Sequence, residues 1–225
     1  MKHFEAVIFD MDGLLLDTES IAFTSFHETC EHFGIGDETE LFMRCIGTNA
    51  ALGEQVLKEG LQGKVDHLHF AHIWDAKYIQ RTSHTPIPLK DGAAELLEQL
   101  AALGVPVAVA TSTASERAMQ KLQAAGILAS FKAVVGGDQV KNSKPHPDIY
   151  MRAAEILGVR PEKCLALEDS ENGVRSAAGA GMTVIQIPDM VKPSPALCSL
   201  GHIILHSLHD VRTYAFQGAQ PAKRR

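Results

Sequence analysis

The sequence has little of several features that mark specialised classes of protein. Its four cysteines lie far apart without a Cys-x-x-Cys pair, which argues against a zinc site or a disulfide framework and favours a reducing compartment. No apolar run approaches the ~20 residues that cross a bilayer. The acidic residues Asp10 and Asp12 come too early for the apolar region of a signal peptide. We therefore expect a cytoplasmic protein that has no membrane partner.

Basic charge and aromatic side chains are also scarce. The 225 residues carry 27 acidic and 21 basic side chains, which gives a net charge of −6, and only 6% of them are aromatic. A nucleic-acid groove needs a basic face and stacking rings, so we expect no nucleic-acid partner. The rest of the composition is that of a globular protein. Its length predicts either one large α/β domain or a core with an insert.

Apolar, β-favouring runs alternate with amphipathic helical patterns after residue 86. The expected strands are residues 4–9, 105–110, 133–135, 164–167, 183–187 and, at an edge, 203–205. The expected helices are 93–103, 116–125, 148–157 and a helix from 171 that ends by 181. This alternation predicts an α/β fold, with a Rossmann-like parallel sheet that has helices on both faces.

Residues 17–86 differ from the rest of the chain. They show helical patterns interrupted by glycines and no convincing strand. We therefore predict a small all-helical domain, residues 17–86, inserted after the first strand. The core would consist of residues 1–16 and 87–225.

Four clusters of polar residues follow the expected strands. They are Asp10 and Asp12, Thr111 and Ser112, Lys144, and Glu168 and Asp169. The carboxyl ends of parallel strands open onto one side of a sheet, so these clusters are expected on one rim. Two carboxylates at i and i+2 suit a nucleophile beside a general acid and base. Asp169 adds a hard oxygen ligand for Mg²⁺, and Lys144 adds positive charge.

The predicted ligand is an anion with several oxygens, such as a phosphate ester. A phosphate at ~4 Å from Asp10 would meet a repulsion of roughly 4 kcal/mol per charge pair at an effective dielectric of ~20. Attack by the carboxylate therefore requires Mg²⁺ and Lys144 to neutralise the charge.

The four clusters belong to longer motifs that follow one another from Ile8 to about Ile187. The motifs are FDMDGLLLDTE at 9–19, VAVATS at 107–112, SKPHP at 143–147 and LEDS at 167–170. In this order they resemble the haloacid dehalogenase-like hydrolase superfamily, in particular its sugar-phosphate phosphatases and β-phosphoglucomutases with a helical cap. The resemblance implies a monomer that hydrolyses a small phosphorylated metabolite, a sugar or polyol phosphate.

The resemblance also implies roles for the individual residues. Asp10 would form an aspartyl-phosphate, and Asp12 would protonate the leaving group and then activate water. Thr111, the backbone of Ser112, and Lys144 would hold the phosphoryl oxygens. Mg²⁺ would be bound by the Asp10 carboxylate, the Asp12 backbone carbonyl and Asp169, with Glu168 close by or acting through water. The helical insert would close over the site as a cap.

Two other functions stay open at this stage. A phosphomutase would share the aspartyl-phosphate, but the mutases usually have a His near Ala22 and an Arg near Ala50, and this sequence has neither. A non-catalytic protein that binds a phosphorylated ligand is the third candidate, because fold alone does not decide function.

Each motif also has a structural interpretation. Asp-x-Asp-Gly can be a capped turn, Thr111 and Ser112 can start a helix, and Lys144 can be a surface lysine. Within the insert, the side chains that could reach a leaving group are Trp74, Lys77 and Tyr78, with Lys77 the preferred specificity residue. The histidines at 67, 69 and 72 do not share one helical face, so no metal site is expected there.

Overall fold

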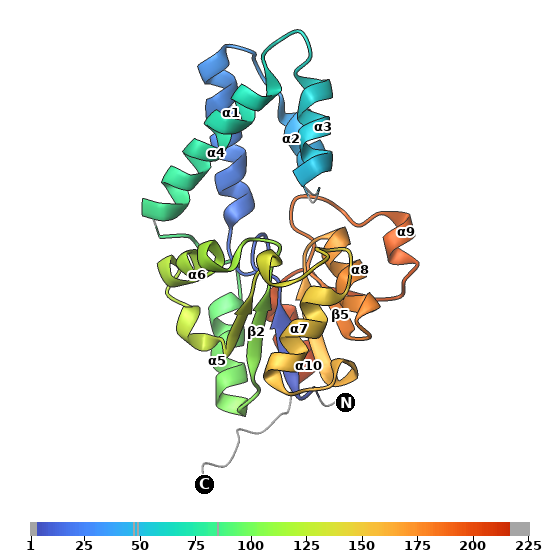
Figure 1. Cartoon of the computed structure of the whole chain (residues 1–225). Coiled ribbons are helices and arrows are strands. Elements are labelled where there is room, and N and C mark those ends of the chain that lie inside the picture. Colours follow the sequence, from blue (N-terminus) through green and yellow to red (C-terminus); the bar gives the residue numbers. More distant parts are fainter. Residues whose placement is uncertain (1–3, 47, 49, 85, 217–225) are drawn as a thin grey trace.

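A six-stranded parallel sheet forms the centre of the molecule. The computed structural model describes residues 4–46, 48, 50–84 and 86–216 (Figure 1). Its strands are β1 (Ala6–Phe9), β2 (Val107–Ala110), β3 (Ala133–Val135), β4 (Cys164–Glu168), β5 (Thr183–Gln186) and β6 (Ile203–Ile204). They lie in the order β3-β2-β1-β4-β5-β6, and all neighbouring pairs are parallel. The predicted Rossmann-like sheet is therefore confirmed.

Helices cover both faces of this sheet because both faces of its strands are apolar. On β1, Val7 and Phe9 pack on one face, while Ala6 and Ile8 pack on the other. The first face is covered by α5 (Ala93–Leu103), α6 (Ser115–Ala124) and α10 (Leu208–Phe216). The second face is covered by α7 (Asp148–Leu157) and α8 (Glu171–Gly179). The short helix α9 (Pro195–Cys198) adds Leu197 to that second face.

Between the end of β1 and residue 86, the described part of the chain forms four helices. They are α1 (Thr18–Phe33), α2 (Thr39–Cys45), α3 (Ala50–Gly60) and α4 (His67–His84). We call them the four-helix segment. They have a hydrophobic cluster of their own, in which Phe26 contacts the rings of Phe42, Phe70 and Trp74. Figure 1 shows the segment standing above the carboxyl ends of the strands. Within the described part of the chain, no helix is long and apolar enough to cross a membrane.

The described residues also form three short 3-10 helices. They are η1 (Leu128–Ser130), η2 (Gly137–Gln139) and η3 (Pro161–Lys163).

The elements agree with the sequence-based prediction except at their ends. Strand β2 begins at Val107 and not at residue 105, because Pro106 has no N–H to donate to a ladder and only its carbonyl pairs with Val7. Strand β4 extends one residue further than expected, since Glu168 still pairs with Gln186 of β5. Strands β5 and β6 each end one residue earlier than expected.

Candidate active site

The predicted polar clusters meet at one rim of the sheet. A cavity of about 410 Å³ is lined by Asp10, Asp12, Thr111, Ser112, Lys144 and Asp169, together with Glu19, Thr48 and Asn172. Asp10 follows β1, Thr111 follows β2, and Asp169 follows β4, so the parallel arrangement of these strands brings the three residues together. Thr48 lies between α2 and α3 and also lines this cavity, so the four-helix segment forms part of the cavity wall.

Lys144 lies between two carboxylates. Its Nζ atom donates to Asp10 Oδ1 at 2.5 Å and to Glu168 Oε1 at 2.6 Å, and the residue is only 7% exposed. Burial by itself would lower the pKa of Lys144, but the charges of Asp10 and Glu168 raise it above the usual lysine value. Lys144 therefore stays protonated, and it is a fixed positive charge and not a surface lysine.

Glu168 is fully buried and is held from several sides. Its Oε1 accepts hydrogen bonds from Lys144 and from the Tyr150 hydroxyl at 2.8 Å. Its Oε2 accepts from the backbone N–H of Asp169 and of Ser170, both at 3.1 Å. A glycine is required at position 173, because an added Cβ would lie 1.7 Å from Glu168 Oε1. The carboxylate thus occupies the start of α8 and fixes the position of Lys144.

The site has more acidic charge than Lys144 can balance. Carboxylate oxygens of Asp10, Glu168 and Asp169 lie within 4.8 Å of one another. Burial, followed by the nearby charges, raises the pKa of Asp10 to about 7 despite Lys144. Burial and the charge of Glu168 also raise the pKa of Asp169 well above its usual value. Three clustered oxygen donors with excess negative charge fit a divalent cation such as Mg²⁺.

Asp12 points to a different set of partners. Its Oδ1 accepts from Lys121 Nζ at 2.7 Å, and its Oδ2 accepts from the Thr113 hydroxyl at 2.8 Å. Burial tends to raise the pKa of Asp12, but Lys121 and Thr113 outweigh burial and lower it. Lys121, on α6, is 4% exposed and also donates to the Tyr78 hydroxyl at 2.9 Å. Asp12 is therefore held ionised, at the point where α4 meets α6.

Replacing Lys121 by methionine should destabilise the protein in a pH-dependent way. The Asp12 side chain, which is 24% exposed, would lose its counter-charge, at a cost of about 2 kcal/mol at pH 7.5. Without Lys121, burial raises the pKa of Asp12, so protonation relieves the penalty as the pH falls. Urea unfolding at pH 7.5 and pH 5 should show a larger deficit of the variant, relative to wild type, at pH 7.5.

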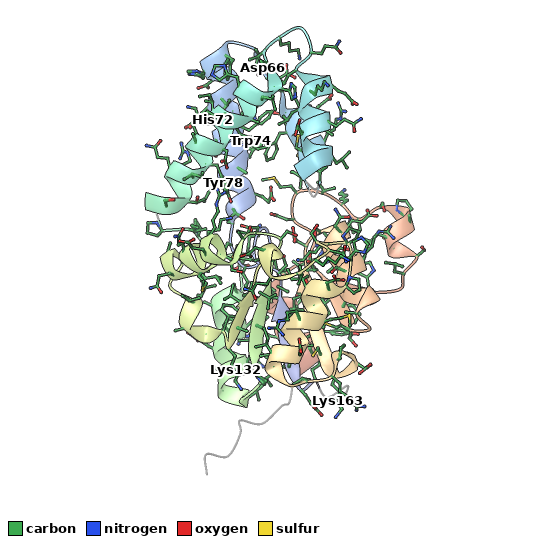
Figure 2. The ribbon with its side chains drawn as sticks, viewed as in Figure 1. Asp66, His72, Trp74, Tyr78, Lys132 and Lys163 are labelled. Atoms are coloured by element: carbon green, nitrogen blue, oxygen red, sulfur yellow. The ribbon has the colours of Figure 1, made fainter. Side chains whose placement is uncertain are left out.

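Lys132→Met is the matched control for this experiment. Lys132 is exposed and lies just before β3, and Figure 2 shows it at the end of the sheet away from the four-helix segment. This variant should unfold within about 0.5 kcal/mol of wild type at both pH values. An equal deficit of Lys121→Met at the two pH values would contradict the assigned role of Lys121.

Sequence reasoning missed several residues of this site. Lys121 and Tyr150 lie on helices with ordinary amphipathic patterns, and no local motif marks them. Glu19 lies in the first motif, at residues 9–19, but the sequence-based prediction assigns no function to it. It lines the cavity, and burial together with the charges of Asp12 and Asp189 raises its pKa to about 7. The sequence signal that could have identified Glu19 as a site residue is its position directly after Asp17 and Thr18 in this motif.

Of the three side chains expected to reach a leaving group, Trp74 and Tyr78 line a cavity and Lys77 does not. Trp74 and Tyr78 on α4 line a second cavity, within the four-helix segment, and Figure 2 shows Tyr78 nearer the sheet than Trp74. Lys77 is half-buried and is not among the described residues that line either cavity. The structure therefore does not support Lys77 as the preferred specificity residue. Within the described ranges, the histidines at 67, 69 and 72 do not belong to a group of side chains whose ligand atoms lie close enough together to hold a metal ion.

Comparison with known proteins agrees with this fold. The sequence model of the haloacid dehalogenase-like hydrolase family matches residues 7–187. The phosphorylated carbohydrates phosphatase of Thermotoga maritima is 33% identical over 216 residues, 96% of this chain and 92% of that protein.

Two solved structures are also similar. One is a haloacid dehalogenase (HAD) family hydrolase from Deinococcus radiodurans R1 with bound phosphate and sodium. It has a TM-score of 0.80 and 29% identity, covering 95% of each chain. The other is CbbY from Rhodobacter sphaeroides in complex with xylulose-(1,5)bisphosphate, with a TM-score of 0.70 and 28% identity, covering 92% of this chain and 96% of that one.

The chain belongs to the haloacid dehalogenase-like hydrolase family. Within that family it is an enzyme of the phosphoric monoester hydrolase class.

Proposed function

We propose that the protein is a Mg²⁺-dependent phosphatase that hydrolyses a phosphorylated sugar or polyol through an aspartyl-phosphate on Asp10. The observation that carries the proposal is the placement of Asp10. Its carboxylate lies against Lys144 and within 4.8 Å of further carboxylate oxygens, in a cavity also lined by Thr111 and Ser112. Such a site combines a carboxylate nucleophile with groups that neutralise an approaching phosphate.

The reaction divides into two displacements at phosphorus. In the first, an Asp10 oxygen attacks the phosphorus, the bond to the leaving oxygen breaks, and that oxygen takes a proton from Asp12, which has to take up this proton from solvent when the ester binds because it is ionised in the free site. In the second, Asp12 accepts a proton from water as the water oxygen attacks the aspartyl-phosphate, which releases phosphate and free Asp10. Lys121 and Thr113 favour the ionised Asp12 that the second displacement needs.

The phosphoryl oxygens would be held by the rim of the cavity. The Thr111 hydroxyl, the Ser112 backbone and Lys144 would supply neutral and charged donors. Mg²⁺ would be held by the carboxylates of Asp10 and Asp169 and the Asp12 backbone carbonyl, with Glu168 close behind. When bound, it would neutralise the charge of the phosphate and the carboxylates. A Cβ at Gly13 would lie 2.6 Å from Asp169 Oδ2, so the glycine leaves room for that carboxylate.

Residues 17–86 would act as a cap domain over a core formed by residues 1–16 and 87–225. The four-helix segment stands over the cavity and contributes Glu19 and Thr48 to its wall. A domain in this position can exclude water during phosphoryl transfer and select the leaving group. The proposed protein works as a monomer in the cytoplasm and has no nucleic-acid or membrane partner.

The sugar phosphate substrate class is supported by similar proteins. The Thermotoga maritima relative is named a phosphatase of phosphorylated carbohydrates, and the CbbY structure contains a sugar bisphosphate. A phosphomutase remains the second candidate, because it would use the same Asp10 and the same cation site. A non-catalytic binding protein is less well supported, since the cavity keeps every group that the chemistry needs.

A phosphate-release assay tests the proposed function. Sugar, polyol and nucleotide monophosphates would each be incubated with the protein and Mg²⁺, and again with excess EDTA. We expect release of phosphate from at least one ester, with a loss of about 10²-fold or more in EDTA that added Mg²⁺ reverses. No release from any ester in the presence of Mg²⁺ would contradict the phosphatase function and leave the mutase and the binding-protein hypotheses.

The mutase alternative needs a separate measurement. The protein would be mixed with a hexose 1-phosphate and a trace of the hexose bisphosphate. A phosphatase should release one phosphate for each ester consumed. Formation of hexose 6-phosphate without net phosphate release would show a mutase instead.

A further inference from the structure

The second cavity lies within the four-helix segment and is not explained by the phosphatase chemistry. It encloses about 480 Å³, within the range of sites that bind small molecules. Trp74 and Tyr78 provide aromatic rings, and Leu57, Leu68 and Ala71 provide aliphatic surface. The indole N–H of Trp74 already donates to the Ala22 carbonyl at 3.0 Å, so the tryptophan offers the cavity an apolar ring.

This cavity adjoins the active site. Thr48 lines both cavities, so the two share a wall. Tyr78, which lines the second cavity, accepts a hydrogen bond from Lys121, and Lys121 donates to Asp12. Asp12 is the residue proposed to protonate the leaving group. A substituent of that leaving group can therefore extend past Thr48 and Tyr78 into the second cavity.

The charges of the cavity wall restrict what can bind there. Glu54 and Asp75 are acidic, and His67 lies 3.9 Å from Glu54. Among the lining residues that the structure describes, none is Lys or Arg. The neighbouring Arg117 lies 3.6 Å from Asp75 and over the Tyr78 ring. A second phosphate would meet the carboxylates of Glu54 and Asp75, and the described lining residues offer it no lysine or arginine, whereas an uncharged ring with N–H donors would meet aromatic surface and hydrogen-bond acceptors.

We propose that the second cavity binds an uncharged planar ring carried by the leaving group, so that the substrate is a phosphorylated sugar with a heterocyclic substituent. The inference rests on the proposed phosphatase function and narrows its substrate class. It also excludes a sugar bisphosphate as the preferred substrate.

A matched series of esters tests the substrate class. Phosphate release would be measured for ribose 5-phosphate, ribose 1,5-bisphosphate, and the 5′-monophosphates of uridine, cytidine and adenosine. We expect kcat/KM at least tenfold higher for one ring-bearing ester than for ribose 5-phosphate, with the bisphosphate below both. If ribose 5-phosphate or the bisphosphate is hydrolysed as well as every ring-bearing ester, the inference is wrong while the phosphatase function stands. If no ester in the series is hydrolysed, both the inference about the ring and the phosphatase function are wrong for ribose phosphates.

Two alanines of α4 provide a variant and its control. Ala71 lines the second cavity, and Ala76 is exposed on the same helix. Ala71→Leu should fill part of the cavity and lower the ratio of kcat/KM between the preferred ring-bearing ester and ribose 5-phosphate at least fivefold. Ala76→Leu should leave this ratio within twofold of wild type. Equal ratios in the two variants would contradict the proposal.

Trp74 supplies a readout that does not depend on turnover. It is the single tryptophan of the chain and it lines this cavity, so its fluorescence reports on the four-helix segment at this place. In an Asp10→Asn background, uridine 5′-monophosphate should change the Trp74 emission in a saturable way, while ribose 5-phosphate should not. Adding Ala71→Leu should weaken the apparent affinity for uridine 5′-monophosphate. The same response to both ligands would show that the ring does not enter the cavity.

Discussion

Replacing Asp10 by asparagine is expected to lower kcat by on the order of 10⁴-fold or more, because the amide cannot serve as the nucleophile. The measurement is release of p-nitrophenol from p-nitrophenyl phosphate in saturating Mg²⁺. An aryl phosphate has a good leaving group, so this assay depends little on Asp12 as an acid. Unchanged turnover would exclude an aspartyl-phosphate on Asp10.

The same substitution should not unfold the protein. Burial raises the pKa of Asp10 to about 7, so the ionised carboxyl opposes folding of the metal-free protein as the pH rises from 3.8 toward that value. Asparagine has nearly the same volume and carries no charge. In EDTA at pH 8, the Tm of the variant should equal or exceed that of wild type. A large fall in Tm would mean that lost activity reflects lost structure.

Replacing Lys144 by methionine should have the largest effect on stability. Lys144 is 7% exposed and neutralises both Asp10 and the fully buried Glu168. Removing one partner of such a buried ion pair costs about 3–5 kcal/mol, because the remaining charges are left without compensation. Urea unfolding at pH 7.5 would measure this loss. Phosphatase activity should also be lost, since no cation would face the phosphoryl group from this loop.

Two further variants separate this effect from a general change in the loop. Lys141 is exposed three residues earlier in the chain, so Lys141→Met should cost less than about 0.5 kcal/mol. The double variant Lys144→Met/Glu168→Gln should lose less stability than the sum of its two single variants, because the glutamine removes the uncompensated charge. Strict additivity would show that the two residues do not act as a buried ion pair.

Most of the fold could be predicted from local patterns. The bounds of α5, β3 and α7 agree with the sequence-based prediction residue for residue. For the two helices the reason is that each is a clear amphipathic run followed directly by a glycine. Helix α7, for example, ends at Gly158, which takes the left-handed conformation that glycine favours. The helices of the four-helix segment are predicted only as a helical region, since glycines inside α3 and between the helices obscure the individual ends.

The candidate site could be predicted in part for a topological reason. In a parallel sheet, residues that follow different strands meet at one edge, so the positions of Asp10, Thr111 and Asp169 in the sequence imply their proximity. The partners of Asp12 could not be predicted in this way. Lys121 reaches Asp12 across 109 positions of the chain, from the side of a helix. Many lysines occupy such positions, and only helix packing selects the one that faces the site.

Local patterns were enough to predict the class of fold, the order of its elements and the four polar clusters, because those depend on periodicity and on where strands end. Tertiary packing was needed to show that Lys144 is buried between Asp10 and Glu168, and that Lys121 and Tyr78 join Asp12 to α4. It also decided that Trp74, and not Lys77, faces a cavity. The physical reason is that helix faces are matched by packing across long stretches of chain, and no local pattern records which faces meet.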